Sequence, residues 1–385
     1  MIKFKVGLIG TGYISIIHLE MLRRFADVEI VAVADSNKQS ANNAAKKFDV
    51  PKVFYTASEL IQEKEVEIIH NCTPNHLHFE INSEAIKAGK EVLSEKPLAL
   101  TSEESAVLVE LAEKHNTVHG VNFCYRYYPV LQEAAARVRN GNLGDVRLVL
   151  GHFLQDWLSF DTDYSWRLDP GMAGASNTMA DLGSHWCDLV QFVTGLRIIE
   201  IMAEFHTILP TRKKPKSGPL SFGASQNNDV EEVKIPVEDY ATIFIRLENG
   251  ARGNFSTCQL AIGKKVDIDL QVYGSKESYS WNHVHPNAIT IGHRDKANEI
   301  FYESPLLQTE DTRKYASLPT GHPIGYHDTI YNFFMDYYTA VAAKREGKKI
   351  QTNYPDFYAG HSEMKIIEAA VRSSKSGGWE KVQGK

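Results

Sequence analysis

Short apolar runs that end in polar residues or glycine recur through the first third of the chain. They lie at residues 4–9, 28–34, 66–71 and 90–94, and helix-spaced apolar positions follow several of them. Strands that alternate with helices are typical of a doubly wound α/β domain built on a parallel sheet. A last strand is expected at 117–121, so we expect this first domain to span residues 1–121.

The remaining residues, 122–385, show a different pattern. Helices are predicted at 129–140, 182–193, 329–344 and 357–373, and strands at 146–154, 198–205, 240–247, 253–259 and 266–273. Asn249-Gly250 lies between two of these strands and is a strong hairpin signal. We therefore expect an α+β domain with a large, mostly antiparallel sheet and helices on one face. Residues 210–233 are rich in Pro, Gly, Ser and Asn and are predicted to be a flexible insertion.

A glycine-rich turn follows the first strand directly. Gly10 permits a tight turn, and Gly12 lets the backbone approach a pyrophosphate at the start of the next helix, where free N–H groups favour anions. The third glycine position of such a fingerprint holds Ser15. Strand, turn and helix stand in the order that a dinucleotide-binding site requires. A nicotinamide cofactor is therefore predicted.

Asp35 ends the second strand, roughly twenty residues after Gly12. A carboxylate there suits a ribose 2′-hydroxyl and repels a 2′-phosphate, which favours NAD. Ser36 and Lys38 are close enough in sequence to serve a phosphate, so NADP stays possible. After the third strand, Pro74 and Asn75 form a turn, and Thr73 and Asn75 are candidates to donate to ribose or phosphate oxygens, although Asn75 is equally suited to cap a helix.

Lys96 stands between Glu95 and Pro97, just after the strand at 90–94. Ligands of an open α/β sheet bind at the carboxyl ends of its strands. A lysine beside a cofactor there is able to move protons. A solvated surface lysine is the ordinary alternative.

A second constellation lies far downstream. Asp181 and His185 are four residues apart in a predicted helix, so they share a face and are able to hydrogen-bond. A carboxylate that orients an imidazole makes a general base near neutral pH. No third ligand at metal spacing is nearby, so no metal is expected. Asp181 as a helix cap and His185 as a buried structural residue remain alternatives.

Taken in order, these motifs resemble the glucose–fructose oxidoreductase / inositol dehydrogenase (Gfo/Idh/MocA) superfamily over nearly the whole chain. The matching landmarks are Gly10-Thr-Gly12, Asp35, Cys72-Thr-Pro-Asn75, Glu95-Lys96-Pro97, Asn122 with Arg126, Trp166-Arg167, Asp181-x-Gly-x-His185-x-x-Asp188 and the C-terminal Gly377-Gly-Trp379. The resemblance implies a Rossmann domain and Lys96, Asp181 and His185 as the catalytic set around a sugar hydroxyl. It also implies a cis peptide before Pro97 and a homodimer or homotetramer. Where many members have a glycine triplet before the aspartate motif, this chain reads Ala173-Gly-Ala-Ser176.

The site residues expected from these patterns and from the resemblance fall into two sets. Cofactor contacts are expected from Gly10, Thr11, Gly12, Tyr13, Ile14, Asp35, Ser36, Thr73, Asn75, His78, Glu95, Lys96, Asn122, Trp166 and Arg167. Substrate contacts are expected from Lys96, Tyr125, Arg126, Gln155, Trp157, Asp181, His185, His322 and Tyr326. The tryptophans as core residues and Arg167 as an ion-pair residue remain alternatives. The strings around Trp157, Trp186 and His322 resemble members that act on anhydrosugars and glycosides.

Composition agrees with an ordinary globular enzyme. The 385 residues are 43% hydrophobic and 23% charged, with a net charge of −6 and no long basic run, so nucleic acid and membranes are not expected partners. Four cysteines without paired spacing, a first strand that begins at once, and no apolar run near the ~18 residues of a membrane span favour a cytoplasmic location.

We therefore expect an NAD(P)-dependent dehydrogenase that acts on a secondary hydroxyl of a sugar, polyol or glycoside. Two other functions remain open: an enzyme that retains its NAD and oxidises a glycoside transiently, and a catalytically silent sugar-binding regulator. The complete Lys96, Asp181 and His185 set argues against the silent regulator.

Overall fold

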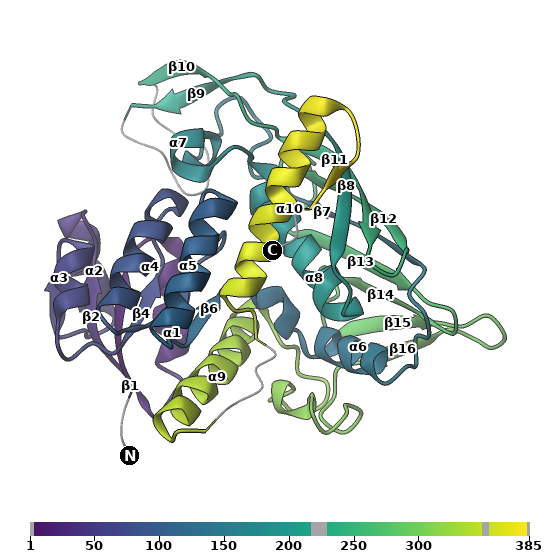
Figure 1. The fold of residues 1–385 in the computed structure, drawn as a ribbon, viewed down its shortest axis with the longest axis horizontal. Coiled ribbons are helices and arrows are strands. Elements are labelled where there is room, and N and C mark those ends of the chain that lie inside the picture. The colour runs from purple at the N-terminus through teal and green to yellow at the C-terminus, as the bar shows by residue number, and fades with distance from the viewer. Residues whose placement is uncertain (1–3, 217–228, 349–353, 383–385) are drawn as a thin grey trace. The chain divides into compact units, whose positions relative to one another are not determined.

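The computed structural model describes residues 4–216, 229–348 and 354–382. The chain forms two compact units: unit 1 is Met1–Cys124 with His327–Met364, and unit 2 is Tyr125–Tyr326 with Lys365–Lys385 (Figure 1). The sequence predicted a division after residue 121. It did not indicate that the chain returns to unit 1 near its C-terminus.

Unit 1 contains a six-stranded parallel sheet in the order β3-β2-β1-β4-β5-β6. Its strands are β1 (Phe4–Ile9), β2 (Val28–Ala34), β3 (Lys52–Phe54), β4 (Ile68–Asn71), β5 (Glu91–Ser94) and β6 (His119–Val121). Its helices include α1 (Tyr13–Leu22), α2 (Lys38–Lys47), α3 (Ala57–Gln62), α4 (His78–Lys87) and α5 (Ser102–Lys114), with the 3₁₀ turn η1 (Asn75–Leu77) before α4. This strand order is that of a dinucleotide-binding fold and confirms the predicted Rossmann domain.

Polar caps set where several of these helices begin. The Asn37 side chain accepts from the Ser40 N–H before α2, and the Thr101 side chain accepts from the Glu104 N–H before α5. Thr56 caps α3 in the same way. Inside, strands buried on both faces supply an aliphatic core that includes Val31, Ile69 and Val92.

The long helix α9 (Tyr326–Arg345) packs closely against the end of the parallel sheet. A Cβ atom on Gly120 of β6 would lie 3.2 Å from both the Phe333 and the Tyr337 rings. Glycine at this position therefore allows the aromatic face of α9 to approach the strand. The first half of α10 (Phe357–Ser376) also belongs to unit 1, and the Phe357 ring joins its core.

Unit 2 is built on a nine-stranded sheet in the order β16-β15-β14-β13-β7-β12-β11-β8-β17. The strands are β7 (Leu148–Leu154), β8 (Ile198–His206), β11 (Tyr240–Leu247), β12 (Arg252–Cys258), β13 (Asp267–Tyr273), β14 (Ser278–Asn282), β15 (Ala288–Gly292), β16 (Glu299–Tyr302) and β17 (Glu380–Lys381). All neighbours are antiparallel except β7 and β12. The large, mostly antiparallel sheet predicted from the sequence is confirmed, and so is the β11–β12 hairpin at Asn249-Gly250.

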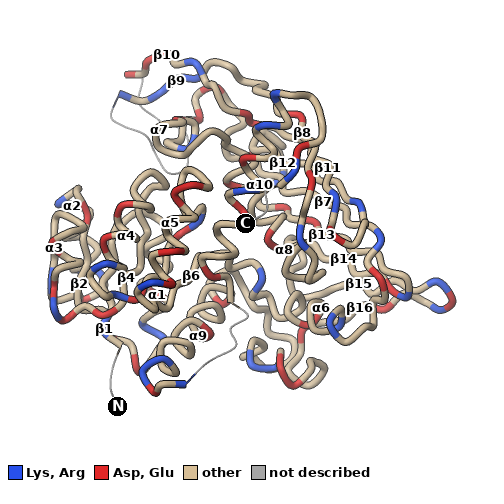
Figure 2. Tube along the Cα trace, in the orientation of Figure 1, with Lys and Arg blue, Asp and Glu red and all other residues tan. Residues whose placement is uncertain are grey.

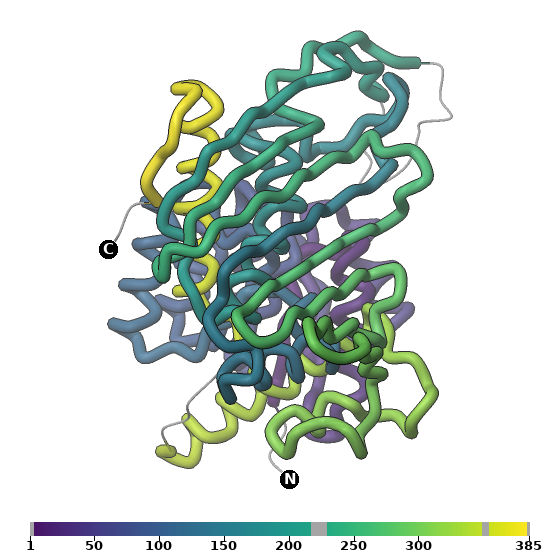
Figure 3. The backbone as a smooth tube through the Cα atoms, turned by 90° about the vertical axis from the view of Figure 1, so that its right-hand side faces the viewer, coloured from purple at the N-terminus to yellow at the C-terminus, as the bar shows by residue number. Residues whose placement is uncertain are grey.

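The helices of unit 2 cover one face of this sheet. They are α6 (Pro129–Arg139), α8 (Ser184–Thr194) and the second half of α10, with short turns at η2 (Cys124–Tyr127), η3 (Trp166–Leu168), α7 (Pro170–Ala173), η4 (Met179–Gly183) and η5 (Arg313–Tyr315). Trp186 of α8 stacks on Phe255 of β12 with ring centroids 4.2 Å apart. In Figure 3 the opposite face turns toward the viewer, and no helix among the described residues of this unit crosses its strands.

Two regions differ from the sequence-based expectation. The insertion predicted at 210–233 contains a hairpin, because β9 (Thr211–Pro215) pairs with β10 (Val230–Lys234), and residues 217–228 lie outside the described part. The predicted helix at 182–193 begins as the π-helical turn η4, which continues into α8. Within the residues that the structure describes, no helix is long and apolar enough to cross a membrane.

Acidic and basic residues are interspersed along the chain of both units (Figure 2). Many form neighbouring pairs, such as Lys52 with Glu65 and Arg246 with Glu200. The near balance of basic and acidic residues agrees with the modest net charge of −6.

Candidate active site

The glycine turn of unit 1 has the geometry of a phosphate cradle. Gly10 has φ 86°, and a Cβ atom there would lie 2.7 Å from the Cys72 carbonyl oxygen, so only glycine fits. Gly12 precedes the first residue of α1, and a Cβ atom there would meet nothing within 4 Å. Open space at a helix N-terminus suits an anionic pyrophosphate.

Asp35 lies at the same turn and is held in place by it. Its Oδ2 accepts from the Thr11 N–H at 2.7 Å and from the Thr11 hydroxyl at 2.8 Å, and its Oδ1 accepts from the Asn37 N–H at 2.8 Å. The carboxylate is therefore oriented at the carboxyl edge of the sheet. The open space at Gly12 suits the pyrophosphate of NAD, and the Asp35 carboxylate suits its ribose hydroxyl. Ser36 is exposed, and Lys38 lies over the Tyr55 ring at 5.0 Å.

The predicted cofactor residues that follow β4 form a braced loop. His78 is buried, its Nδ1 lies 2.6 Å from the Pro97 carbonyl oxygen and its Nε2 lies 2.8 Å from the Thr73 carbonyl oxygen. His78 thus links the Thr73 turn to the Lys96–Pro97 segment. Because the ring is buried, it supports these two segments and is not exposed. Asn75 is buried at the start of η1, whereas Tyr13 is 56% exposed.

Behind Lys96 lies a buried chain of polar side chains. Glu95 Oε1 accepts from Asn122 Nδ2 at 2.6 Å and lies 2.9 Å from His18 Nε2; His18 Nδ1 lies 3.0 Å from His70 Nδ1, and His70 Nε2 lies 2.8 Å from the Tyr338 hydroxyl. Burial lowers the pKa of His70 well below its ordinary value, so this ring is neutral. Burial opposes ionisation of Glu95, yet the hydrogen bonds from His18 and Asn122 hold its pKa below the usual range.

Lys96 is therefore mounted on an anchored segment. The side chain of Lys96 is half-buried, and its backbone N–H donates to Glu95 Oε2 at 3.3 Å. The Lys96–Pro97 peptide is cis, which the resemblance had implied. Pro97 and Leu98 are buried, so the chain after the lysine is held by packing.

In unit 2, Asp181 stands on the π-helical turn η4, a kind of turn that is frequent at functional sites. Its Oδ2 accepts from Gln259 Nε2 at 3.0 Å, and its Oδ1 lies 3.3 Å from Arg167 Nε. Arg167 in turn lies over the Trp166 ring at 4.7 Å. The structure thus brings together two motifs that were predicted separately, Trp166-Arg167 and Asp181, and shows the ion pair that was the alternative for Arg167.

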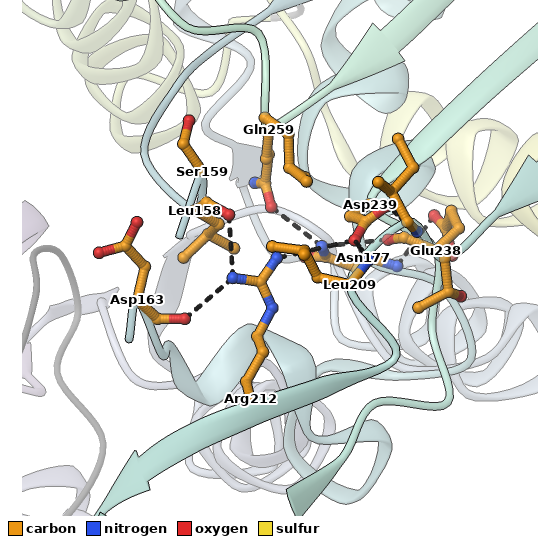
Figure 4. A network of polar contacts seen from close by, with 12 residues as sticks. Leu158, Ser159, Asp163, Asn177, Leu209, Arg212, Glu238, Asp239 and Gln259 are labelled. Carbon is orange, nitrogen blue, oxygen red and sulfur yellow. Dashed lines mark hydrogen bonds and ion pairs between the residues drawn. The ribbon is translucent and has the colours of Figure 1, made fainter. Parts of the chain in front are cut away.

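A buried carboxylate fixes the segment that leads into this turn. Glu238 Oε1 accepts from the Ser176 hydroxyl at 2.6 Å and from the backbone N–H groups of Asn177 and Met179, each at 3.0 Å. Figure 4 shows Glu238 beside Asn177. Ser176 belongs to the stretch that replaces the glycine triplet of many Gfo/Idh/MocA members. In this chain the hydroxyl of Ser176 has a specific partner, the carboxylate of Glu238.

His185 lies near the start of α8 among aromatic rings. The Tyr125 ring meets it edge-on with centroids 4.8 Å apart, and the Phe153 ring lies 6.3 Å away. Tyr125 also contacts Tyr326 at 5.8 Å and His283 at 5.4 Å. Three predicted substrate residues, His185, Tyr125 and Tyr326, are thus brought together.

Other predicted substrate residues have structural partners. Arg126 Nε donates to Asp188 Oδ2 at 2.7 Å and its Nη2 bonds Asp188 Oδ1, which makes a two-pronged pair with α8. Gln155 is buried and its backbone N–H donates to the Cys258 carbonyl, whereas Trp157 is half-buried. His322 is exposed and its Nδ1 lies 3.0 Å from the Pro319 carbonyl oxygen.

Sequence reasoning missed several residues of these networks. His18 and His70 interrupt apolar stretches of a helix and a strand, and polar residues at such positions were an available signal. Asn177, Glu238 and Gln259 had no such signal, because their partners in these networks are 59 or more positions away in the sequence. Among the described residues, no group of three or more His, Cys, Asp or Glu side chains is arranged to hold a metal ion.

Two models of known protein families match this chain. Residues 4–123 match the model of an oxidoreductase family with an NAD-binding Rossmann fold, and residues 131–280 match the GFO/IDH/MocA C-terminal domain. The chain belongs to the Gfo/Idh/MocA oxidoreductase family. The family resemblance and the nicotinamide cofactor inferred from the sequence are thereby confirmed.

Individual relatives in this family act on sugars. Levoglucosan dehydrogenase of Pseudarthrobacter phenanthrenivorans is 28% identical, with 98% of each chain covered. Glucose-6-phosphate 3-dehydrogenase of Bacillus subtilis is 27% identical, with 74% of this chain and 77% of the relative covered. A solved structure of levoglucosan dehydrogenase with NADH and L-sorbose superposes with a TM-score of 0.88 at 26% identity over the whole of both chains.

Proposed function

We propose that this protein is an NAD-dependent dehydrogenase that oxidises a secondary hydroxyl of a neutral sugar, polyol or glycoside. The observation that carries the proposal is that the candidate proton-handling residues stand on anchored segments. Lys96 follows the buried Glu95 network in unit 1, and Asp181 is held by Gln259 and Arg167 in unit 2. Side chains carried by segments fixed in this way are suited to stabilise charge as it develops in a reaction.

The roles proposed for the side chains follow from their chemistry. A ring nitrogen of His185 takes the proton of the substrate hydroxyl, and Asp181 orients the imidazole on the same helical segment. Lys96 Nζ donates a hydrogen bond to the same oxygen and stabilises its negative charge. NAD, when bound, supplies the acceptor for the hydride.

The cofactor residues proposed are those of the glycine turn. Gly12 and the N-terminus of α1 receive the pyrophosphate, and Asp35 accepts from the ribose hydroxyls. The carboxylate of Asp35 already stands at this turn through its bonds to Thr11 and Asn37. A 2′-phosphate there would meet a negative charge.

The charge partners in unit 2 favour a substrate without phosphate. Arg126 is engaged by Asp188, and Arg167 is engaged by Asp181. Phosphate sites gather several donors or use a helix N-terminus. The two arginines that contact the Asp181-to-Asp188 segment are thus each neutralised by a carboxylate.

A spectrophotometric screen tests the proposal. Purified protein with NAD and a panel of free sugars, polyols, glycosides and their phosphates should produce NADH with a neutral member and much less with its phosphate. Faster turnover of glucose 6-phosphate than of glucose or levoglucosan would overturn the neutral-substrate proposal. Consumption of a glycoside without NADH would favour an enzyme that retains its NAD, and binding without conversion would favour a regulator.

A further inference from the structure

The carboxylate of Asp181 is contacted by Gln259 and Arg167, to which the proposed mechanism assigns no step of the reaction. We propose that Gln259 is a positioning residue for Asp181, and that Asn177 and Glu238 fix the direction in which its amide points. The inference rests on the proposed function, because it assigns a role to Gln259 through the candidate catalytic residue Asp181.

Gln259 is placed by backbone and side-chain contacts on three sides. It follows β12 directly, is 2% exposed, and its backbone N–H donates to the Asp239 carbonyl oxygen at 3.2 Å. Its Nε2 donates to Asp181 Oδ2 at 3.0 Å. Its Oε1 accepts from Asn177 Nδ2 at 2.9 Å, a contact that Figure 4 shows. Arg167 Nε approaches the other oxygen, Asp181 Oδ1, at 3.3 Å.

The hydrogen bonds allow one direction for each amide. A carboxylate oxygen only accepts, so the group of Gln259 that faces Asp181 is its NH₂. The Gln259 oxygen then faces Asn177, whose NH₂ also donates to the Glu238 carbonyl oxygen at 3.2 Å. The amide donors thus point in one direction, from Asn177 through Gln259 to Asp181.

The Glu238-Asp239 pair anchors this chain of donors. Glu238 is 3% exposed and binds Ser176, Asn177 and Met179, the segment just before Asp181. Asp239 accepts from the Ile208 N–H at 2.7 Å and the Leu209 N–H at 3.0 Å. Two successive carboxylates therefore fix the loops on both sides of the Asn177–Gln259 contact.

Arg212 extends the anchor to a third loop. The guanidinium is 1% exposed, and its Nη1 donates to the carbonyl oxygens of Leu158 at 2.9 Å and Asp163 at 3.1 Å (Figure 4). Its Nη2 lies 3.7 Å from Asp239 Oδ2. The charged residues linked to Gln259, directly or through one intervening residue, are thus Asp181, Arg167, Glu238, Asp239 and Arg212.

Two substitutions of Gln259 test the role of its donor. Gln259→Leu removes the hydrogen bond to Asp181 Oδ2, and a displaced catalytic group costs about 10–100-fold in rate. We expect this loss in kcat, with an unchanged Kd for NAD. Gln259→Glu keeps the shape but removes the donor at neutral pH; its kcat, relative to that of the unmutated protein, should rise as the pH is lowered and the new carboxyl gains a proton.

Gln271 supplies a matched control within the same sheet. Its Nε2 donates to Asp269 Oδ1 at 2.8 Å and its Oε1 accepts from the Tyr273 hydroxyl at 2.7 Å, so it makes the same type of contact away from Asp181. Gln271→Leu and Gln271→Glu should leave kcat within about twofold and its pH profile unchanged.

The outcomes separate this inference from the proposed function. If Asp181→Asn abolishes turnover while both Gln259 variants keep kcat within about twofold, Gln259 has no positioning role. If Asp181→Asn itself turns over normally, the role proposed for Asp181 fails and the positioning role of Gln259 fails with it, whereas absence of NADH from the unmutated protein with every sugar tested would overturn the proposed function. Circular dichroism and NAD binding establish folding, and if Gln259→Leu does not fold, the pH profile of the isosteric Gln259→Glu decides: relative activity that does not rise at low pH overturns the proposal.

Discussion

At the scale of single residues, the charge of Asp35 is expected to set cofactor preference. Asp35→Asn keeps an acceptor for Thr11 and removes the charge, and Asp35→Ser also shortens the side chain. Both should shift kcat/KM from NAD toward NADP, because a 2′-phosphate no longer meets a carboxylate.

The comparison of the two variants separates charge from loop structure. Steady-state kinetics with both cofactors measure the shift, and Asp35→Asn should show most of it if charge dominates. A clear preference of the unmutated protein for NADP would contradict the assignment.

The side chain of Lys96 is expected to matter in the chemical step. Lys96→Ala leaves the Gly10–Gly12 turn and Asp35 untouched, so NAD should still bind. Loss of a donor aimed at the reacting oxygen should lower kcat by about 10²–10³-fold. Lys96→Arg should not restore the rate, because a guanidinium is larger and planar and holds its proton.

Titration with NAD and measurement of kcat on the same preparation of Lys96→Ala show whether the lysine acts in the chemical step. Near-normal kcat in Lys96→Ala would remove the lysine from the mechanism. Loss of folding would assign it a structural role instead.

At the scale of elements, the buried histidines that join α1, β4 and α9 should make unit 1 sensitive to acid. Burial lowers the pKa of His70 well below the ordinary value of 6.5, so the folded state resists a proton that the unfolded chain binds. This contribution to stability is complete above about pH 6.5 and is lost as the pH falls below it, at up to about 1.4 kcal/mol per pH unit.

Urea unfolding of His70→Gln between pH 7.5 and 5.5 tests this expectation. The variant should lose less stability across that interval than the unmutated protein does, whatever its stability at pH 7.5. The exposed His115 in the same unit provides the control, and His115→Gln should keep the original slope. Equal slopes for all three proteins would show that His70 titrates normally.

The elements of unit 1 were predictable because their signals are local. Strands buried on both faces read as continuous apolar runs, and the helix caps at Asn37, Thr56 and Thr101 stand next to the helices they begin. The short strands β14 to β16, which lie toward one edge of the nine-stranded sheet, mix polar and apolar residues and gave no comparable run. These strands are defined by their hydrogen bonds to neighbouring strands rather than by a local sequence pattern.

The candidate site was predictable only in part, for the same reason. Lys96, Asp181 and His185 belong to compact motifs, and so does the glycine turn. The π-helical form of η4 was not visible, because a helix pattern does not distinguish i+4 from i+5 hydrogen bonding. Gln259 and Glu238 act through contacts across 78 and 59–62 sequence positions, which no local pattern encodes.

At the scale of the whole molecule, the open face of the large sheet is expected to form an interface. Alternation along β11 buries Ile243 and Ile245 on the helix side and leaves Phe244 44% exposed on the other. Phe244 lies level with Met202 of β8, and Tyr302 at the sheet edge is 61% exposed. We propose that a second copy of the chain covers this face in a homodimer or homotetramer.

Sedimentation velocity at micromolar concentration tests the assembly. The unmutated protein should sediment as a dimer or tetramer, and Phe244→Lys should shift it toward the monomer. Val107, 41% exposed on α5 of unit 1, gives the control, and Val107→Lys should not change the assembly. A stable monomer of the unmutated protein would refute the proposal.

The central claim is that a hydride passes from a secondary carbon of a neutral sugar to NAD. The most direct measurement uses a turned-over sugar deuterated at the oxidised carbon, with the mass of the reduced cofactor as the readout. We predict that the deuterium appears in the cofactor, and that His185→Ala and Lys96→Ala abolish most of the transfer while still binding NAD. Sugar consumption without deuterium in the cofactor, or transfer that is unaffected in both variants, would contradict the account.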